Sequence, residues 1–277
     1  PCNSLKTFET VARDMENSIP MRRLVQGDVG SGKTVVAMLA LVLFPATAHA
    51  DTEAPKGTEQ VTEPIDIVSD DSSRSGNGWA WDSETKTLVL NGLDMDLSSV
   101  EDCIAGIVLP EGDINIVLQD TSRIRVAGTG VNGIYANGSL SILGADDSFL
   151  RIDAVDGAEG IEVGQALEIS NTKIMSLGMH YGIHCKTFSM EYTELTAEAE
   201  GGIALRIDPT TEMLSAGPVF SVLDDPDNVT SSLDLYGERG ALVIFGEADD
   251  DFLVVESTVM PPHLGDPDDL AHFQAVF

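Results

Sequence analysis

The residues from Gly27 to Thr34 read GDVGSGKT and match the phosphate-loop pattern G-x-x-x-x-G-K-[ST]. In such a loop, the backbone N–H groups around Gly27, Gly30 and Gly32 would close on phosphate oxygens. Lys33 would reach the terminal phosphates, and the Thr34 hydroxyl would bind a magnesium ion. The motif therefore predicts a site for ATP and Mg²⁺ near the N-terminus.

The segment around this loop, DMENSIPMRRLVQGDVGSGKTVVAMLA, resembles the first nucleotide-binding motif of RecG-type DNA helicases. The resemblance covers about residues 1–40 and implies a fragment of an ATP-dependent DNA helicase. A helicase also needs an acidic motif on a second strand, which binds magnesium and polarises the attacking water. We find no such motif in the sequence, because INIVLQD, which ends at Asp120, fits the repeat described below. We therefore expect the loop to be vestigial.

A second interpretation of the same region begins at Met21. Two arginines follow this residue, then the apolar run VVAMLALVLF at 35–44, and then AHA at 48–50. A basic start, a short apolar run and a small-x-small ending are typical of a secretory signal peptide, here cleaved before Asp51. The run is shorter than the roughly 20 residues of a membrane-spanning helix. We predict a secreted or cell-surface protein, with residues 1–33 as a fused fragment and no membrane contact after cleavage.

Acidic residues dominate the chain after residue 50. The formal net charge is −31, and residues 51–277 hold 42 of the 46 acidic residues but only 10 of the 15 lysines and arginines. Nucleic-acid binding requires basic side chains that neutralise phosphates, so a surface this acidic would repel DNA. We expect this part of the chain to have no nucleic-acid partner and to be monomeric.

Short apolar triplets recur along the chain at spacings of 26, 26, 27 and 21 residues. They are LVL at 88–90, INI at 114–116, LSI at 140–142, LEI at 167–169 and FSM at 188–190. A second set of Gly-Ile pairs keeps step with them, beginning at Gly106, Gly133, Gly160, Gly182 and Gly202. Between them lies a third set of strand-like segments, RIRV, LRID and ELTA. Alternation within each triplet is the period of a half-buried strand.

This pattern predicts an all-β fold, a parallel β-solenoid with three short strands per coil, preceded by a helical leader segment. Each coil would stack its Ile or Leu on that of its neighbour. The alternative is a β-sandwich, in which strands recur every 8 to 12 residues. The solenoid also predicts that Cys103 and Cys185 stay unpaired, because about three coil rises, roughly 14 Å, would separate them.

The predicted boundaries follow from composition and from the repeat. Residues 1–50 hold the phosphate-loop fragment and the leader, 51–75 a flexible acidic linker, 76–260 the solenoid, and 261–277 an irregular tail. Trp79 and Trp81 lie on one face of a strand, and DSETK makes a turn after it. We expect this hairpin to cap the first coil.

The opening GWAWDSETKTLVLNG and coils of the GIYANGSLSILG type resemble secreted or surface-attached parallel β-helix proteins of gut bacteria, which are described as carbohydrate-binding. The resemblance spans about residues 75–205 and implies a glycan or host-surface ligand. Exposed aromatic rings stack on sugars. The ligand candidates are therefore Trp79, Trp81, Tyr135 and Tyr181, although the cap would explain the tryptophans and ordinary packing the tyrosines.

Acidic clusters suggest two further kinds of site. Asp146 and Asp147 are adjacent, and Asp120, Asp153 and Asp156 would lie near them, as in the paired carboxylates of polysaccharide hydrolases. Calcium prefers oxygen ligands such as those concentrated in LDDPDN and EADDD. The calcium candidates are Asp224, Asp225, Asp227, Asp249 and Asp250. His180 and His184 flank a strand corner and are interpreted as surface residues, because their spacing would suit a metal only on a helix.

Taken together, these features favour a secreted bacterial β-solenoid that acts as a binding or adhesion module. Carbohydrate is the favoured ligand, and no catalytic activity is expected. A helicase fragment at the phosphate loop is one alternative. A polysaccharide lyase or hydrolase built on a β-helix is the other, and it would use Asp146 or Asp147.

Overall fold

A computed structural model describes residues 54–68, 72–100, 103–145, 147–216, 218–223, 231–245, 252–255 and 271–276. The chain divides into two units, residues 1–49 and 50–277, and all described residues belong to the second. This unit is all-β, with one short helix, α3 (Thr211–Ala216), among the described residues. The predicted leader helix and phosphate loop lie outside these residues.

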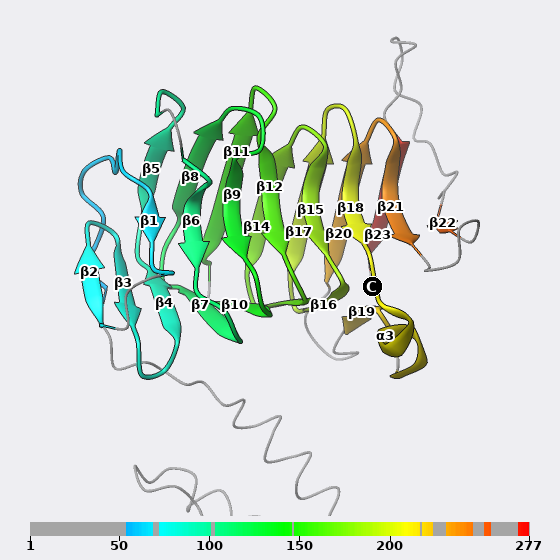
Figure 1. Cartoon of the computed structure of the whole chain (residues 1–277), viewed down its shortest axis with the longest axis horizontal. Coiled ribbons are helices and arrows are strands. Elements are labelled where there is room, and N and C mark those ends of the chain that lie inside the picture. Colours follow the sequence, from blue (N-terminus) through cyan, green and yellow to red (C-terminus); the bar gives the residue numbers. More distant parts are fainter. Residues whose placement is uncertain are drawn as a thin grey trace, which may run out of the picture. The chain divides into compact units, whose positions relative to one another are not determined.

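Three sheets make up the described part of this unit (Figure 1). The first sheet contains, in spatial order, β1 (Ile65–Asp66), β6 (Ala105–Leu109), β9 (Asn132–Ala136), β12 (Glu159–Val163), β15 (Tyr181–Cys185), β18 (Ile203–Ile207), β21 (Gly240–Phe245) and β22 (Phe252–Val255). The second sheet contains β19 (Phe220–Leu223), β16 (Thr187–Glu191), β13 (Ala166–Ser170), β10 (Leu140–Gly144), β7 (Ile114–Leu118), β4 (Thr87–Leu90), β3 (Trp79–Asp82) and β2 (Arg74–Gly76). The third sheet contains β23 (Ala271–Val276), β20 (Ser232–Gly237), β17 (Glu194–Ala199), β14 (Lys173–Gly178), β11 (Phe149–Val155), β8 (Ser122–Ala127) and β5 (Asp94–Leu97).

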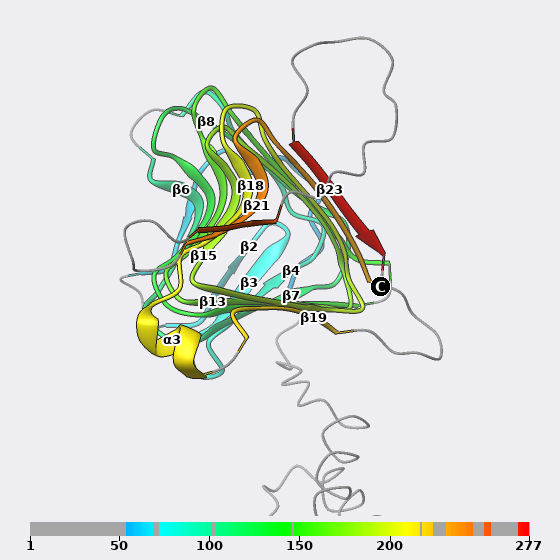
Figure 2. The same ribbon diagram turned by 90° about the vertical axis from the view of Figure 1, so that its right-hand side faces the viewer.

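Successive strands enter the three sheets in turn. β6 joins the first sheet, β7 the second and β8 the third, and the same order repeats up to β21. Neighbouring strands are parallel in this part of each sheet. Antiparallel pairs occur only at sheet ends among the described residues, where β2, β3, β22 and β23 lie. Viewed from the side, the three sheets surround one interior (Figure 2).

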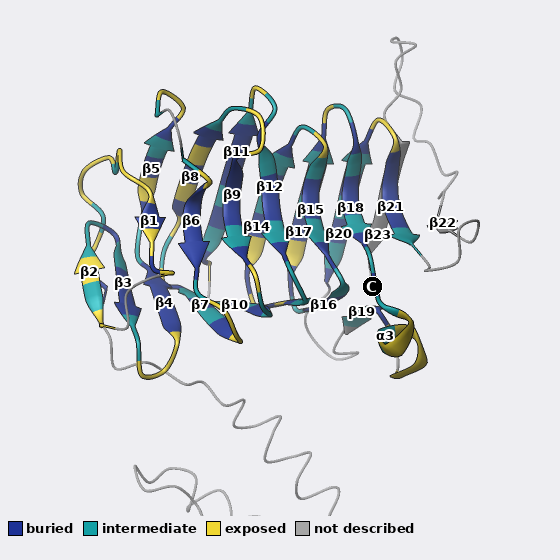
Figure 3. Cartoon of the chain, in the orientation of Figure 1, coloured by how far each residue is buried: buried dark blue, intermediate teal, exposed yellow. Residues whose placement is uncertain are grey.

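That interior is filled by apolar side chains from all three sheets. β7 shows the pattern: Ile114, Ile116 and Leu118 are buried and the residues between them are half-buried. In the first sheet, β6 and most of β9 are buried along their length, and α3 has no buried residue (Figure 3). One connected cluster joins residues from β1 to β21. Burial of this apolar surface is the main term that stabilises the sheets.

The predicted ladders pair largely as the spacing indicated. Ile114, Leu140, Leu167 and Phe188 occupy one row of the second sheet, each beside the next. The first step is different, because Leu88 pairs with Ile116 and so is shifted by two residues. A shift of two keeps the same side chains facing the core, whereas a shift of one would reverse them.

The Gly-Ile ladder also holds until its last step. Ile107, Ile134, Ile161 and Ile183 lie in one row of the first sheet. Ile183 then pairs with Leu205 and not with Ile203, so the prediction for Gly202 was wrong by two residues. Ala204, which is fully buried, takes the place that glycine has in the earlier strands. In the earlier strands the approach is closer, since a Cβ at Gly133 would come within 2.7 Å of the Gly160 carbonyl oxygen.

The sheets extend beyond the predicted limits of 76 and 260. β1 pairs with β6, and Ile65 and Ile67 are buried in the core, so this part of the predicted acidic linker belongs to the fold. β23 pairs with β20 within the segment predicted to be an irregular tail. Both are edge strands, and β1, with only two residues, is too short to show a periodicity.

A row of buried hydroxyl groups lies at the corner where the chain enters the third sheet. Its members are Ser148, Thr172, Thr193 and Ser231, and the buried Ser122 lies near the same corner but pairs with Leu150. The Ser148 and Thr172 hydroxyl oxygens are 2.9 Å apart, and the Thr193 amide donates to Ser231 Oγ at 3.3 Å. Because buried polar groups need partners, each hydroxyl satisfies groups of the neighbouring strand at this corner.

Replacing Thr172 by Val should test this row. The substitution keeps the shape of the side chain but leaves the buried Ser148 hydroxyl without its 2.9 Å partner. We expect the free energy of unfolding to fall by about 1–3 kcal/mol, measured by urea denaturation. Thr196→Val, at a half-buried outward position of β17, is the matched control and should change it by less than about 0.5 kcal/mol. Equal losses in the two variants would show that the hydroxyl row contributes nothing specific.

Candidate functional site

The outward face of the third sheet carries a recess of about 230 Å³ over β8, β11, β14 and β17. We call it the arginine recess. Its lining comprises three arginines, Arg123, Arg125 and Arg151; three carboxylates, Asp153, Glu198 and Glu200; and the residues Ala154, Val155, Leu177 and Gly178. Sites for drug-sized ligands usually measure about 300–1,000 Å³, so this recess fits a group about as large as one sugar ring.

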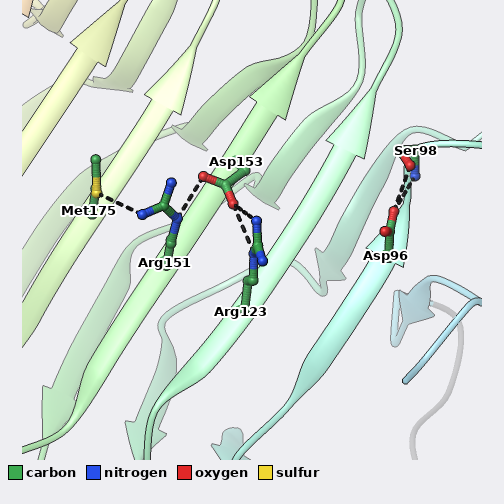
Figure 4. A network of polar contacts seen from close by, with 6 residues as sticks. All are labelled: Asp96, Ser98, Arg123, Arg151, Asp153 and Met175. Atoms are coloured by element: carbon green, nitrogen blue, oxygen red, sulfur yellow. Dashed lines mark hydrogen bonds and ion pairs between the residues drawn. The ribbon is translucent and has the colours of Figure 1, made fainter. Parts of the chain in front are cut away.

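Asp153 organises the basic side of the recess (Figure 4). Arg123 donates to Asp153 Oδ2 from Nε at 2.9 Å and from Nη2 at 2.6 Å. Arg151 donates from Nε to Oδ1 at 2.8 Å. The Asp153 side chain is only 9% exposed, whereas Arg123 and Arg151 are 48% and 39% exposed. One buried carboxylate therefore fixes two guanidinium groups that still reach the surface.

The strand register explains why this carboxylate is needed. Arg123 and Arg151 are directly paired on β8 and β11, and Arg125 is paired with Asp153 two positions further along. Like charges directly opposite each other destabilise a sheet. Asp153 offsets this repulsion because it accepts hydrogen bonds from both arginines, and charge-assisted bonds of this kind are strong.

The recess carries positive charge at one end and negative charge at the other. Arg125, Asp153, Leu177 and Glu198 form a single row across four neighbouring strands. The three arginines outnumber Asp153 at the β8 and β11 side, whereas Glu198 and Glu200 lie at the β17 side. Leu177 separates the two sides. The arrangement can bind an anionic group at one end and hydroxyl or cationic groups at the other.

Ionisable groups next to the recess respond to this environment. Hydrogen bonds from the Ser98 hydroxyl and amide hold the pKa of Asp96 below its usual value, and Arg125 and Arg123 add to the effect. Tyr236 follows Glu198 in the same row of the sheet. Partial burial raises the pKa of Tyr236, and the negative charges of Asp234 and Glu198 raise it further.

The two tryptophan candidates pack against the core. Trp81 is 1% exposed, so it cannot offer a ring face to a sugar. The prediction that Trp81 binds a ligand is therefore wrong. Trp79 is half-buried and packs on the core cluster, with the Arg74 guanidinium 5.9 Å from its ring centroid. The antiparallel pairing of β2, β3 and β4 places both residues in the expected terminal hairpin.

The tyrosine candidates lie on the outward face of the first sheet. Tyr181 is engaged by its neighbours: its hydroxyl accepts from Arg206 Nη1 at 2.7 Å, and the Arg206 guanidinium lies 5.1 Å from its ring centroid. Tyr135 is half-buried and pairs with Glu162 of the next strand. The two rings therefore lie on the same sheet face, and neither lines the arginine recess.

The histidines lie beside carboxylates on that same face. His184 Nε2 is 2.9 Å from Asp208 Oδ2, and the same oxygen accepts from Arg206 Nε at 2.7 Å. His180 Nδ1 is 2.7 Å from Glu159. The two histidines thus contact separate carboxylates. His180 is exposed and His184 is half-buried, in agreement with the prediction that both are surface residues.

The acidic candidates are dispersed. Asp120 forms an exposed ion pair with Lys56 at 2.8 Å, and Asp147 and Asp156 are exposed residues with positive φ angles. Only Asp153 of this group lines the arginine recess. Asp146 lies outside the described residues, as do all five calcium candidates: Asp224, Asp225, Asp227, Asp249 and Asp250. In the described ranges, no group of three or more His, Cys, Asp or Glu could hold a metal ion.

Two further observations concern the thiols and the helices. Cys103 and Cys185 are both free, and burial raises the pKa of the Cys185 thiol. Across the part of the chain that the structure describes, no helix is long and apolar enough to cross a membrane.

Sequence reasoning missed the arginine recess. The sequence predicts strands at the RIRV and LRID segments, but it does not show which of their arginines lie side by side. Basic residues are scarce after residue 50, and this scarcity could have pointed to the site. Only 10 lysines and arginines follow residue 50, and three of them fall at outward positions of adjacent strands: Arg123, Arg125 and Arg151.

A short part of the chain is similar to segments of RecG helicases. It is 39% identical over 69 residues to "ATP-dependent DNA helicase RecG" of Escherichia coli O127:H6, covering 25% of this chain and 9% of that protein. The RecG proteins of Pasteurella multocida and Thermotoga maritima are 51% and 54% identical over 39 and 37 residues, covering 14% and 13% of this chain and 6% and 5% of theirs. The chain thus spans less than a tenth of each helicase. No family model and no solved structure matches it.

Asp153→Asn should show how far the arginine pair depends on this carboxylate. The substitution removes the negative charge between Arg123 and Arg151, which leaves two paired guanidinium groups opposite each other. We expect the free energy of unfolding to fall by about 1–3 kcal/mol in urea denaturation. Asp156→Asn, at an exposed position with a positive φ that Asn tolerates, should change it by less than about 0.5 kcal/mol. A neutral Asp153→Asn would contradict the assigned role.

Proposed function

We propose that the part of the chain after residue 50 is a parallel β-solenoid with three strands per coil, and that it is a secreted, non-catalytic carbohydrate-binding module. Two arrangements support the solenoid. Successive strands enter three sheets in a repeating order, and equivalent apolar residues pair strand after strand, as in the row from Ile114 to Phe188. Each round of chain buries its apolar face only against its neighbours, which is typical of repeat proteins.

The arginine recess is the observation that carries the binding function. Protein sites for sugars combine an apolar surface with a few placed polar groups that read hydroxyls. Here Leu177 and Val155 supply apolar surface, Glu198 and Glu200 supply acceptors, and the arginines supply donors. All of them except Glu200, which follows β17 in a turn, project from the strands of a sheet, and a site on such rigid elements is held more precisely than a site on loops.

Two neighbouring features support binding over hydrolysis. Hydrolases place a carboxylic acid and a second carboxylate on opposite sides of the bond they cleave. Asp153 is buried and accepts three hydrogen bonds from two arginines, so both of its oxygens are already engaged within the protein. Glu198 and Glu200 belong to the same side of the recess. We therefore assign the recess to recognition.

Glycan binding can be tested with the full chain on a panel of neutral and acidic oligosaccharides. We expect at least one glycan to bind wild-type protein and to lose binding in Leu177→Trp, because the larger ring fills the recess. Ser141→Trp, at an outward position of the second sheet, should retain binding and serves as the matched control. A panel with no bound glycan would overturn the proposal, and release of new sugar ends from any of them would favour the lyase or hydrolase alternative.

Secretion is proposed from residues 21–50, and a helicase fragment is the second candidate because of the RecG similarity. Both concern the same N-terminal residues. Expression of the full chain in a secreting bacterial host should yield a mature protein in the medium that begins at Asp51, identified by N-terminal sequencing. An intact cytoplasmic protein that retains Lys33 and binds ATP would contradict secretion and favour the helicase fragment.

A further inference from the structure

We infer that the arginine recess is specific for an acidic sugar, whose carboxylate or sulfate group binds the arginines while its ring hydroxyls face Glu198 and Glu200. This inference rests on the proposed carbohydrate function and adds the class of ligand. It starts from an imbalance: residues 51–277 contain far more acidic than basic residues, yet three arginines meet at one place on the surface.

Only part of the positive charge in the recess is neutralised. Asp153 is shared by Arg123 and Arg151, so this network of three residues keeps one positive charge. Arg125 adds a second, because within the described residues it has neither a hydrogen-bond nor an ion-pair partner. Asp96 pairs with Arg125 across the strands and offsets part of its charge, although the hydrogen bonds of Asp96 come from Ser98. The recess therefore offers a positive end that another anion can neutralise.

The donors at this end are preorganised. Arg151 uses Nε for Asp153, and its Nη1 lies 3.6 Å from Met175 Sδ, which is only a weak acceptor. Within the described residues, the Nη groups of Arg151 thus have no oxygen partner. Guanidinium groups bind carboxylates and sulfates through parallel N–H donors. Because Asp153 already fixes two of the three arginines, an incoming anion does not have to order them.

The opposite end sets the rest of the ligand. Arg125 and Glu198 lie in one row and are separated by the strands that carry Asp153 and Leu177. Three strand spacings of about 4.8 Å place them roughly 14 Å apart at the backbone. A simple inorganic anion would fill only the arginine end. An acidic sugar places its ring over Leu177 and directs hydroxyl groups to Glu198, and the same glutamates would repel a ligand with two distant negative charges.

The test compares ligands that share one ring and differ in a single group. Binding of glucose, glucuronate and glucose 6-sulfate to the full chain is measured by ligand-observed NMR titration, with acetate and inorganic sulfate as ring-free anions. We expect glucuronate, glucose 6-sulfate or both to bind at least about tenfold more tightly than glucose and than the matching free anion. A charge-assisted hydrogen bond contributes about 1.5–3 kcal/mol, which corresponds to at least this factor.

Substitution of Arg125 tests the position of the anion without breaking the Asp153 network. Arg125→Ala should weaken binding of the acidic sugar about tenfold or more, a larger factor than its effect on glucose, and Arg125→Lys should restore part of the loss. Lys173→Ala, which removes an exposed cation on β14 that pairs with Glu194, is the matched control and should have no effect. Circular dichroism should show that all variants fold.

The possible failures separate the two proposals. Equal binding of glucose and glucuronate, with no effect of Arg125→Ala, would overturn the acidic-sugar inference and leave carbohydrate binding intact. Equal binding of glucuronate and acetate, both dependent on Arg125, would overturn the assignment to a sugar, since the ring then contributes nothing. If none of the five compounds binds, the inference is overturned for sugars that carry a carboxylate and for sugars that carry a sulfate.

Discussion

The packing of equivalent side chains on successive strands is the constraint on which the rest of this structure depends. No strand of the three sheets can bury its inward side chains alone, because the core lies between strands of all three sheets. Hydrogen bonding along the sheets and apolar packing inside them must therefore be satisfied together by the same register. The glycines of the first sheet and the buried hydroxyl groups of the third meet this condition at the corners, where backbone groups approach most closely.

The same register determines what the outer surface can carry. Residues that pair across parallel strands project side by side, so any charge on one strand is placed next to its equivalent on the neighbour. In a chain with so many acidic residues, this arrangement would concentrate repulsion, and half-buried neutral residues such as Met175 and Thr196 interrupt it. At the arginine recess the sign is reversed, and a single buried aspartate makes two adjacent arginines compatible with the sheet.

Most of the fold could be predicted because it repeats, and most of the site could not because it does not. The LSI, LEI and FSM triplets pair as their spacing indicated, since equal spacing of apolar residues is itself the signal. The register failed where the repeat changes, at Leu88 and Leu205, because a slip of two residues preserves the apolar face and is invisible to an alternation pattern. The recess depends on arginines from two different rounds of chain, and their proximity follows only from the exact strand pairing.

The direction of the outermost strands has a consequence for how long such an assembly can become. Parallel sheets built from equivalent rounds of chain could in principle continue from one molecule into the next and grow as a fibre. Among the described residues, three of the six sheet edges end instead in antiparallel strands, β2, β22 and β23, and β1 at a fourth edge is only two residues long. At these four edges a second molecule would meet a reversed or truncated hydrogen-bonding pattern, which disfavours continuation of the sheets from one molecule into the next.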